Sequence, residues 1–263
     1  MAGNYWKQRA IPYSPGQTTP YKVSRTKIEL FTQCPRCFWL DARLKIKRPS
    51  GPPFNINKAI DELFKKEFDV YRAGGKPHPL MTKFKVGGKP YQHADLDKWR
   101  HNFTGVVHLH EPTNLHVFGA VDDVWEDEDG KLMVVDYKAT AKDKPVVKLG
   151  PKGGWQDMYR RQMEVYQWLL RQNDFDVSDT GYFVYATGTQ DRDGFNDKID
   201  FETNVFPHHG NSDWVDQTLL DMKACLEGDI PAVGTAAMGG PCEHCEYAKS
   251  RTLLTLEALK NKK

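Results

Sequence analysis

The sequence predicts a mixed α/β fold in which helices cover a β-sheet. Two segments have strong helical periodicity, a β-hairpin lies between them, and further strand and helix patterns follow. This order of helix, hairpin, helix, strand and helix is typical of a single layered α/β structure. The predicted elements are a helix at 55–75, a hairpin at 118–140, a helix at 155–173, strands at 180–187 and 198–207, and a helix at 212–228.

The N-terminal elements are marked by caps and by apolar spacing. Ser24 has the side chain of an N-cap, which predicts a helix that begins near residue 24. Pro and Gly at 48–55 indicate a loop. In the next helix, apolar side chains recur every three or four residues, and Gly74 ends it. These apolar residues are Ile60, Leu63, Phe64, Phe68 and Tyr71.

The hairpin carries acidic residues and a lysine on strands that otherwise have a buried pattern. Because side chains alternate along a strand, Asp136 and Lys138 point to the same face. The turn decides which acid on the first strand joins them. A two-residue turn places Asp123 opposite Asp136, whereas a three-residue turn with Gly130 in the left-handed conformation places Asp122 there.

Two ionised carboxylates that face each other on a half-buried surface repel. Such a pair requires a cation, a shared proton or a lysine to offset its charge. A hard divalent ion such as Mg²⁺ suits oxygen ligands of this kind, and Lys138 would hold and help deprotonate a water beside it. The alternative is an exposed acidic hairpin with ordinary ion pairs.

Composition and charge limit the classes of protein. The 263 residues are 39% hydrophobic and 27% charged, which is typical of a globular protein. No apolar run approaches the roughly 20 residues that span a membrane, and residues 1–22 show no apolar segment of a secretory signal. We therefore expect a cytoplasmic protein. Residues 1–23, rich in Pro, Gly and Thr, are predicted to form an extended basic arm.

Basic residues concentrate in the first fifty positions, although the net charge of the chain is only +2. Ten Lys or Arg residues there accompany only two acids, Glu29 and Asp41. Such a local excess suits a polyanionic partner such as DNA, although a solvated basic arm would have the same composition. The residues that we expect to contact DNA are Arg25, Lys27, Arg36 and Arg43.

Four of the five cysteines form two C-x-x-C pairs, one at Cys34 and Cys37 and the other at Cys242 and Cys245. In a cytosolic protein such pairs more often bind a metal than form disulfides. Four thiolates suit a tetrahedral Zn²⁺ ion and equally a [4Fe–4S] cluster. Cys225 lies in a helical pattern, and we expect it to be a buried apolar residue.

The hairpin and the helix that follows it resemble the PD-(D/E)XK nuclease superfamily. The closest resemblance is to its RecB-like exonuclease branch, which includes the CRISPR-associated exonucleases that carry an iron–sulfur cluster. The matching residues are Gly119 to Asp122, then Asp136 to Lys138, then the Gln-x-x-x-Tyr element at Gln162 and Tyr166.

The resemblance covers residues 24–250 and implies a restriction-endonuclease-like core, in which helices flank a central mixed β-sheet. This core would form a single nuclease domain at 24–263. A terminal cysteine subdomain, at about 24–50 and 229–250, would be joined by the four-cysteine metal site.

The resemblance also implies a role for each residue of the hairpin. It selects Asp122 as the metal ligand, and with it the three-residue turn. Mg²⁺ or Mn²⁺ would be held by Asp122, Asp136 and the backbone carbonyl oxygen of Tyr137. Lys138 would orient the attacking water and stabilise charge on the phosphate.

The helices on either side of the hairpin would complete the implied site. Gln162 and Tyr166, four residues apart on one helix face, would position water or the DNA strand. The RecB-like branch has a histidine ligand on the helix before the hairpin, and Asp61 occupies that place here, with Glu62 beside it. Asp61 is therefore a predicted ligand of Mg²⁺ or Mn²⁺. Alternatively, it is a solvated charge paired with Lys65.

The cysteines also depart from the pattern of the iron–sulfur subgroup. That subgroup has one cysteine near its N-terminus and three near its C-terminus, whereas this chain has two and two. The resemblance favours a [4Fe–4S] cluster over Zn²⁺, with a structural role in fixing the terminal segments.

The residues and the resemblance together predict a metal-dependent deoxyribonuclease, an exonuclease that acts on single-stranded DNA or free ends. DNA repair, recombination, phage replication and CRISPR-related processing all suit it. The partner protein would then be a helicase, a recombination protein or a CRISPR protein. The alternatives are a DNA-binding scaffold with little or no catalysis and a metal-stapled protein-interaction module.

Overall fold

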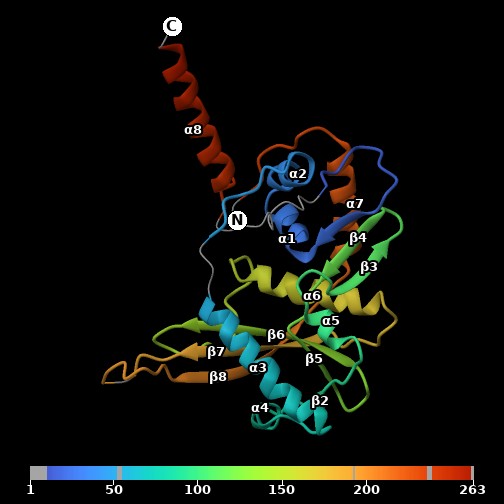
Figure 1. Cartoon of the computed structure of the whole chain (residues 1–263), viewed down its shortest axis with the longest axis vertical. Helices are drawn as coiled ribbons and strands as arrows, with labels where there is room; N and C mark the ends of the chain where they lie inside the picture. Colours follow the sequence, from blue (N-terminus) through green and yellow to red (C-terminus); the bar gives the residue numbers. More distant parts are fainter. Residues whose placement is uncertain (1–10, 52–54, 192, 236–238, 262–263) are drawn as a thin grey trace, which may run out of the picture. The chain divides into compact units, whose positions relative to one another are not determined.

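The structure is a computed structural model with two compact units, shown as a ribbon in Figure 1. It describes residues 11–51, 55–191, 193–235 and 239–261. Unit 1 consists of residues 1–50, 110–115 and 216–263, and unit 2 consists of residues 51–109 and 116–215. The first ten residues of the predicted arm and residues 52–54 of the predicted loop lie outside the described residues.

Unit 1 is mainly helical. Its elements are β1 (Tyr21–Ser24), α1 (Arg25–Gln33), α2 (Pro35–Leu44), most of α7 (Trp214–Glu227) and α8 (Glu243–Lys260). Ser24 is the predicted N-cap, and its Oγ accepts a hydrogen bond of 3.3 Å from the N–H of Lys27. The helix then breaks at Cys34, because Pro35 cannot continue α1 but suits the first position of α2. The helix predicted to begin near residue 24 is therefore two helices in the structure, α1 and α2.

The part of the predicted arm that the structure describes belongs to unit 1 and packs against the end of α7. Tyr13 is only 2% exposed, and its hydroxyl donates a hydrogen bond to Glu227 near the end of α7. The N–H of Gly16 donates to the other oxygen of the same carboxylate at 2.9 Å. The chain turns at Gly16, whose φ is +71°, and β1 then begins at Tyr21.

Unit 2 is built on a mixed sheet of five strands in the order β2-β5-β6-β7-β8. β6 and β7 are parallel, and the other neighbouring pairs are antiparallel. Figure 1 shows α3 lying across the strands. The elements of this unit are α3 (Asn55–Ala73), α4 (Pro79–Lys83), β2 (Lys89–Pro90), α5 (Leu96–Arg100), β5 (Asp123–Glu126), β6 (Leu132–Ala141), α6 (Asp157–Arg171), β7 (Thr180–Gly188) and β8 (Phe201–His209). β3 (Val106–His110) and β4 (Leu115–Gly119) contain residues of both units.

The two faces of β6 are covered by different helices. Val135 and Tyr137 belong to the apolar cluster that includes Phe64 and Phe68 of α3. Asp136, between them on the strand, points to the opposite face, where it contacts α6. This arrangement of helices on both sides of a mixed sheet is the predicted fold class and is consistent with a restriction-endonuclease-like core.

The hairpin between β5 and β6 has the three-residue turn. The N–H of Asp127 donates to the carbonyl of Lys131 at 2.9 Å, which leaves residues 128–130 as the loop. Gly130 has a φ of +83°, the left-handed conformation that such a turn needs at this position. The register that follows pairs Asp123 with Val135 and therefore sets Asp122 opposite Asp136.

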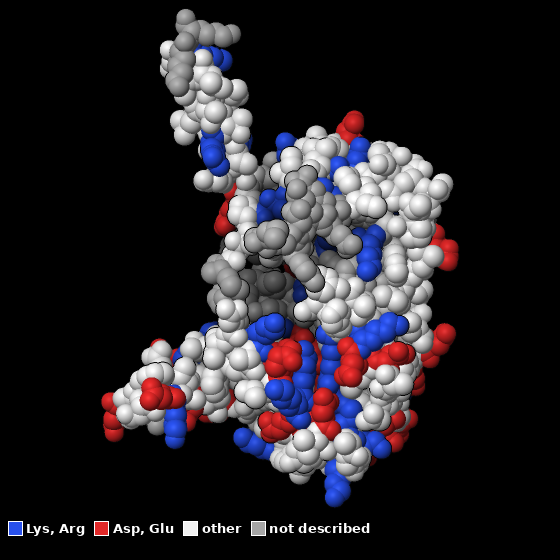
Figure 2. All heavy atoms as spheres, viewed as in Figure 1, with Lys and Arg blue, Asp and Glu red and all other residues white. Residues whose placement is uncertain are grey.

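Charged side chains of opposite sign are mixed over the surface of α3. Figure 2 shows Lys and Arg interspersed with Asp and Glu there rather than separated by sign. Lys65 pairs with Asp61 at 2.7 Å and with Glu62 at 3.6 Å, one turn away on the helix. Among the described residues, no helix has the length and apolarity needed to cross a bilayer.

Candidate functional site

Asp122 and Asp136 form the centre of the candidate site in unit 2. Asp122 is the residue before β5, and its Oδ2 accepts a hydrogen bond of 2.9 Å from the N–H of Tyr137. Asp136, in the middle of β6, is completely buried. The three-residue turn therefore brings together two carboxylates that are 14 residues apart in the sequence.

The proximity of these two carboxylates alters the acidity of Asp122. Burial, followed by the charge of Asp136, raises the pKa of Asp122 to about 7, although Lys138 and Lys65 act in the opposite direction. A carboxylate with a raised pKa is poorly stabilised as an anion by its surroundings. A cation at this place would supply the missing stabilisation.

Lys138 lies on the same face of β6 as Asp136 and forms an ion pair with its Oδ2. Its ammonium group is also 4.6 Å from the centroid of the Tyr159 ring of α6. Burial alone would lower the pKa of Lys138, but Asp136 and Asp122 outweigh it and the pKa is raised. Lys138 therefore places a positive charge beside the two carboxylates, where it can orient a water or a phosphate oxygen.

Helix α6 contributes Gln162 and Tyr166 to the same face. The Nε2 of Gln162 donates to Asp136 Oδ1 at 2.8 Å and approaches the Tyr166 hydroxyl at 3.3 Å. Space for the tyrosine ring comes from Gly119 at the end of β4. A Cβ on that glycine would lie 2.6 Å from Tyr166 Cε1, so a side chain there would displace the ring.

Asp61 lies near this centre on the first half of α3. Burial and the charge of Asp122 raise its pKa, while Lys65 pairs with its Oδ2. Its other oxygen, Oδ1, is buried and has no hydrogen-bond partner among the described residues. The carboxylates of Asp61, Asp122 and Asp136 do not all approach within 4.8 Å of one another. In the described part of the chain, only the four cysteines form a group of possible metal ligands at that spacing. The structure thus leaves Asp61 bonded to Lys65, close enough for Asp122 to affect its pKa.

A buried charge network behind the site was not predicted from the sequence. Asp123, which is completely buried, forms ion pairs with Arg72 of α3 and with Arg100 of α5, the latter at 2.8 Å. The hydroxyl of Tyr137 also donates to Asp123 at 2.7 Å. Tyr137 is thereby held at both its side chain and its N–H, which bonds to Asp122. Because Arg72 is 51 residues before Asp123, no local pattern indicates this pairing.

The residues at this centre suit a hard divalent cation. The donors are carboxylate oxygens, and burial together with the charge of Asp136 raises the pKa of one of them, Asp122. Lys138 beside them provides a fixed positive charge. Asp122 and Asp136 would hold the ion; the backbone carbonyl of Tyr137 as a further ligand stays a prediction.

A second candidate metal site lies in unit 1, where the four predicted cysteines converge. Their sulfur atoms all lie within 4.8 Å of one another, and all four cysteines are free thiols. Cys34 and Cys242 each stand at the N-terminus of a helix, α2 and α8. Cys225 is separate from this group, and burial raises the pKa of its thiol to about 11.

The four cations predicted to contact DNA are in α1 and α2 of unit 1. Lys27 pairs with Asp41 at 3.1 Å. Arg36 donates to the carbonyl of Pro231 at 3.4 Å, and Arg43 donates to the carbonyl of Leu226 at 2.7 Å. The fourth, Arg25, is the first residue of α1.

No curated protein matches the chain. Among solved structures, the chain is similar to the crystal structure of SSO0001, with a TM-score of 0.36 and 13% identity over 80% of this chain and 78% of that one. A similarity at this level bears on neither the fold nor the activity.

The family comparison agrees with the acidic centre. A model of the PD-(D/E)XK nuclease superfamily matches residues 56–250, about three quarters of the chain. The matched segment includes α3, the acidic hairpin and α6, and so every residue placed above at the acidic centre. The superfamily consists of metal-dependent nucleases, and the chain belongs to it.

Proposed function

We propose that the protein is a Mg²⁺- or Mn²⁺-dependent deoxyribonuclease of the RecB-like branch, an exonuclease that degrades DNA from single-stranded or free ends. Membership of the superfamily implies a metal-dependent nuclease. The observation that carries the finer proposal is the hydrogen bond of 2.8 Å between Gln162 and Asp136. It connects the Gln-x-x-x-Tyr helix directly to a carboxylate of the predicted metal site.

The residues of the site divide the work of phosphodiester hydrolysis. A divalent ion, when bound, polarises the phosphate and eases departure of the leaving oxygen. Asp122 and Asp136 hold it, together with the carbonyl of Tyr137. The Lys138 ammonium donates hydrogen bonds that orient the attacking water and stabilise charge on the phosphate. Gln162 keeps one oxygen of Asp136 occupied, which leaves Oδ2 directed toward Lys138.

Asp61 and the cations of unit 1 have supporting roles in this proposal. Asp61 binds the metal at the position where the RecB-like branch has a histidine. To do so, it gives up its ion pair with Lys65. Arg25, Lys27, Arg36 and Arg43 contact the DNA backbone without sequence preference, so that binding weakens as salt increases.

The decisive experiment is degradation of end-labelled single- and double-stranded DNA with Mg²⁺ or Mn²⁺. We expect Asp136→Ala and Lys138→Ala each to abolish detectable cleavage. Matched controls are Asp143→Ala and Lys142→Ala, exposed residues just beyond the same strand, and both should cleave like wild type. Cleavage that persists in the Asp136 and Lys138 variants contradicts the site.

Circular DNA separates exonuclease from endonuclease activity. An exonuclease degrades linear single strands and leaves a circular single strand of the same sequence intact. Equal degradation of both forms contradicts the exonuclease assignment but retains the nuclease. Tight, salt-dependent binding without cleavage supports the scaffold alternative, and the absence of DNA binding supports a protein-interaction module.

A further inference from the structure

The four cysteine sulfurs of unit 1 are packed as closely as ligands of a single metal ion. The Sγ atoms of Cys37 and Cys242 are 3.7 Å apart, and Cys245 Sγ lies 3.8 Å from Cys34 Sγ and 3.6 Å from Cys37 Sγ. The remaining pairs are within 4.8 Å. None of these cysteines forms a disulfide.

These distances distinguish a single ion from a cluster. A Zn²⁺ ion bonds to thiolate sulfur at about 2.3 Å, so a regular tetrahedron of four such ligands has S···S edges of about 3.8 Å. In a [4Fe–4S] cluster each cysteine binds a different iron, and the cysteine sulfurs stand outside the corners of a cube, about 6 Å apart. The spacing of 3.6–3.8 Å matches the first geometry and is too short for the second.

We propose that the four cysteines bind one tetrahedral Zn²⁺ ion in place of an iron–sulfur cluster. The two C-x-x-C knuckles supply two ligands each, which is the ligand set of a closed structural zinc site. Among divalent ions, four thiolates bind Zn²⁺ more tightly than Fe²⁺. The site then holds no open coordination position and has a structural role.

The surroundings of the sulfurs suit thiolates held in this geometry. The N–H groups of Gly234 and Cys37 approach Cys34 Sγ at 3.3 Å and 3.5 Å, and Arg48 approaches Cys242 Sγ at 3.3 Å. Four thiolates around a dication carry a net charge of about −2, and these donors disperse it. Zinc ligands are oriented by such contacts in the same way.

Gly234 also connects the two knuckles. A Cβ on this glycine would lie 2.5 Å from the Cα of Cys34, so no other residue fits there. Its carbonyl accepts a hydrogen bond of 2.7 Å from the N–H of Cys242. Through Gly234, the backbone therefore holds Cys34 of the first C-x-x-C pair close to Cys242 of the second without a metal. This separation is short enough for one ion to bind both pairs.

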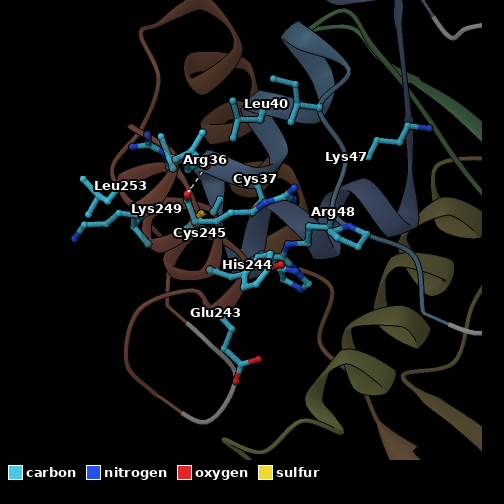
Figure 3. Close-up of a pocket in the computed structure, with 18 of the residues that line it drawn as sticks. Arg36, Cys37, Leu40, Lys47, Arg48, Glu243, His244, Cys245, Lys249 and Leu253 are labelled. Atoms are coloured by element: carbon cyan, nitrogen blue, oxygen red, sulfur yellow. Dashed lines mark hydrogen bonds between the residues drawn. The ribbon is translucent and has the colours of Figure 1, made fainter. Parts of the chain in front are cut away.

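One side of the site borders a groove. The groove lies in unit 1 and has a volume of about 1250 Å³. Cys37 and Cys245 are among the residues that line it (Figure 3). Arg36 and Arg48 line it as well. A small thiol reagent can therefore approach Cys37 and Cys245 of the folded protein from this groove, which allows the metal to be released and counted.

Metal analysis of the full-length protein tests the proposal, with purification in air and, in parallel, under anaerobic conditions from iron-supplemented cells. We expect one equivalent of zinc per chain, no acid-labile sulfide and no broad absorption near 400 nm, roughly where iron–sulfur clusters absorb. A thiol-blocking mercurial should release that equivalent to a coloured chelator. Replacement of the zinc by Co²⁺ should give the visible bands of tetrahedral thiolate coordination.

Variants show whether the four cysteines hold the ion. Cys34→Ser and Cys245→Ser should each lower bound zinc at least tenfold in dialysed protein. Cys225→Ser, outside the group, should retain one equivalent. Iron in place of zinc, with or without sulfide, overturns the proposal, as does a folded chain that retains no metal. No step uses DNA, so the result is independent of the nuclease assay.

Discussion

The surroundings of Asp122 suit a metal ligand, but without a metal they destabilise the folded protein. Its pKa is raised to about 7, first by burial and then by Asp136, from an ordinary value near 4. In the unfolded chain the same carboxylate ionises freely. The folded protein is therefore destabilised by this group at any pH above about 7, and the effect disappears below about pH 4, where both states are protonated.

We accordingly expect Asp122→Asn to stabilise the metal-free protein while it abolishes cleavage. Asparagine keeps an acceptor for the N–H of Tyr137 but removes the repelling charge. In the presence of a chelator at pH 8, the gain should be roughly 1–3 kcal/mol, and it should shrink toward pH 4. Thermal unfolding at several pH values measures it.

The control for this prediction is Asp143→Asn, an exposed residue, which should change stability little at any pH. Mg²⁺ should raise the melting temperature of the wild type and of this control, but not of Asp122→Asn. A variant at Asp122 that is less stable than wild type at pH 8 contradicts the assignment of a repelling carboxylate.

Asp123 has the opposite character, because it is the buried anion that pairs with both Arg72 and Arg100; their other anionic partner, Asp69, is half exposed. Replacing it by Asn leaves Arg72 and Arg100 in the interior without that partner. We expect a loss of about 3–5 kcal/mol in the free energy of unfolding, measured by chemical denaturation. Asp129→Asn, in the exposed turn of the same hairpin, should lose less than about 0.5 kcal/mol. Equal effects of both substitutions would contradict the network.

At the scale of elements, the hairpin shows what the sequence could and could not predict. The strands and the glycine of the turn were evident, because alternation and a left-handed glycine are local properties. The register remained open between Asp122 and Asp123, since one residue of loop length exchanges the two faces. In the structure, the turn at 128–130 sets Asp122 opposite Asp136.

Other elements depended on distant contacts that no local pattern reveals. β1 at Tyr21–Ser24 lies in a segment predicted as an extended arm. α8 was not predicted, because its apolar residues do not keep to one face; Leu253, Leu254 and Leu259 are all exposed. Gly119 belongs to the motif at 119–122, but the sequence does not show why a glycine is needed there. The cause is the close approach of the Tyr166 ring, 47 residues later in the chain.

The contact between β4 and α6 can be tested by substitution. Gly119→Ala should reduce cleavage and lower stability by about 1–3 kcal/mol, because its Cβ meets the Tyr166 ring. It should destabilise a Tyr166→Ala background by clearly less than it destabilises wild type, as a double-mutant cycle shows. Gly51→Ala is the control, since a Cβ there meets no atom within 4 Å. Additive effects would mean that the two residues do not interact.

At the scale of the whole molecule, a superfamily core is combined with a metal site made from both ends of unit 1. The nuclease core of unit 2 is assembled from residues 51–109 and 116–215. The four-cysteine site instead joins Cys37 to Cys242, which are 205 residues apart. A bound metal therefore closes a very long loop, and loop closure restricts the unfolded chain more than the folded one.

Loss of that closure should be measurable. Cys34→Ser should lower the free energy of unfolding by roughly 5 kcal/mol, the order of magnitude that the entropy of so long a loop gives. It should also expose residues 229–235 and 239–242 to limited proteolysis. Cys225→Ser should remain within about 1 kcal/mol of wild type and resist the protease. Unchanged stability and protease resistance in Cys34→Ser would show that the site does not fasten these segments.

The separation of the two knuckles also determines when this site can form during translation. The ribosome makes the first pair of cysteines 205 residues before the second. At about 5–20 residues per second, the first pair therefore remains without its partners for roughly 10–40 seconds. During that interval a nascent chain exposes two thiols that air or peroxide can oxidise. A reducing environment at the point of synthesis is therefore a condition for the correctly assembled molecule.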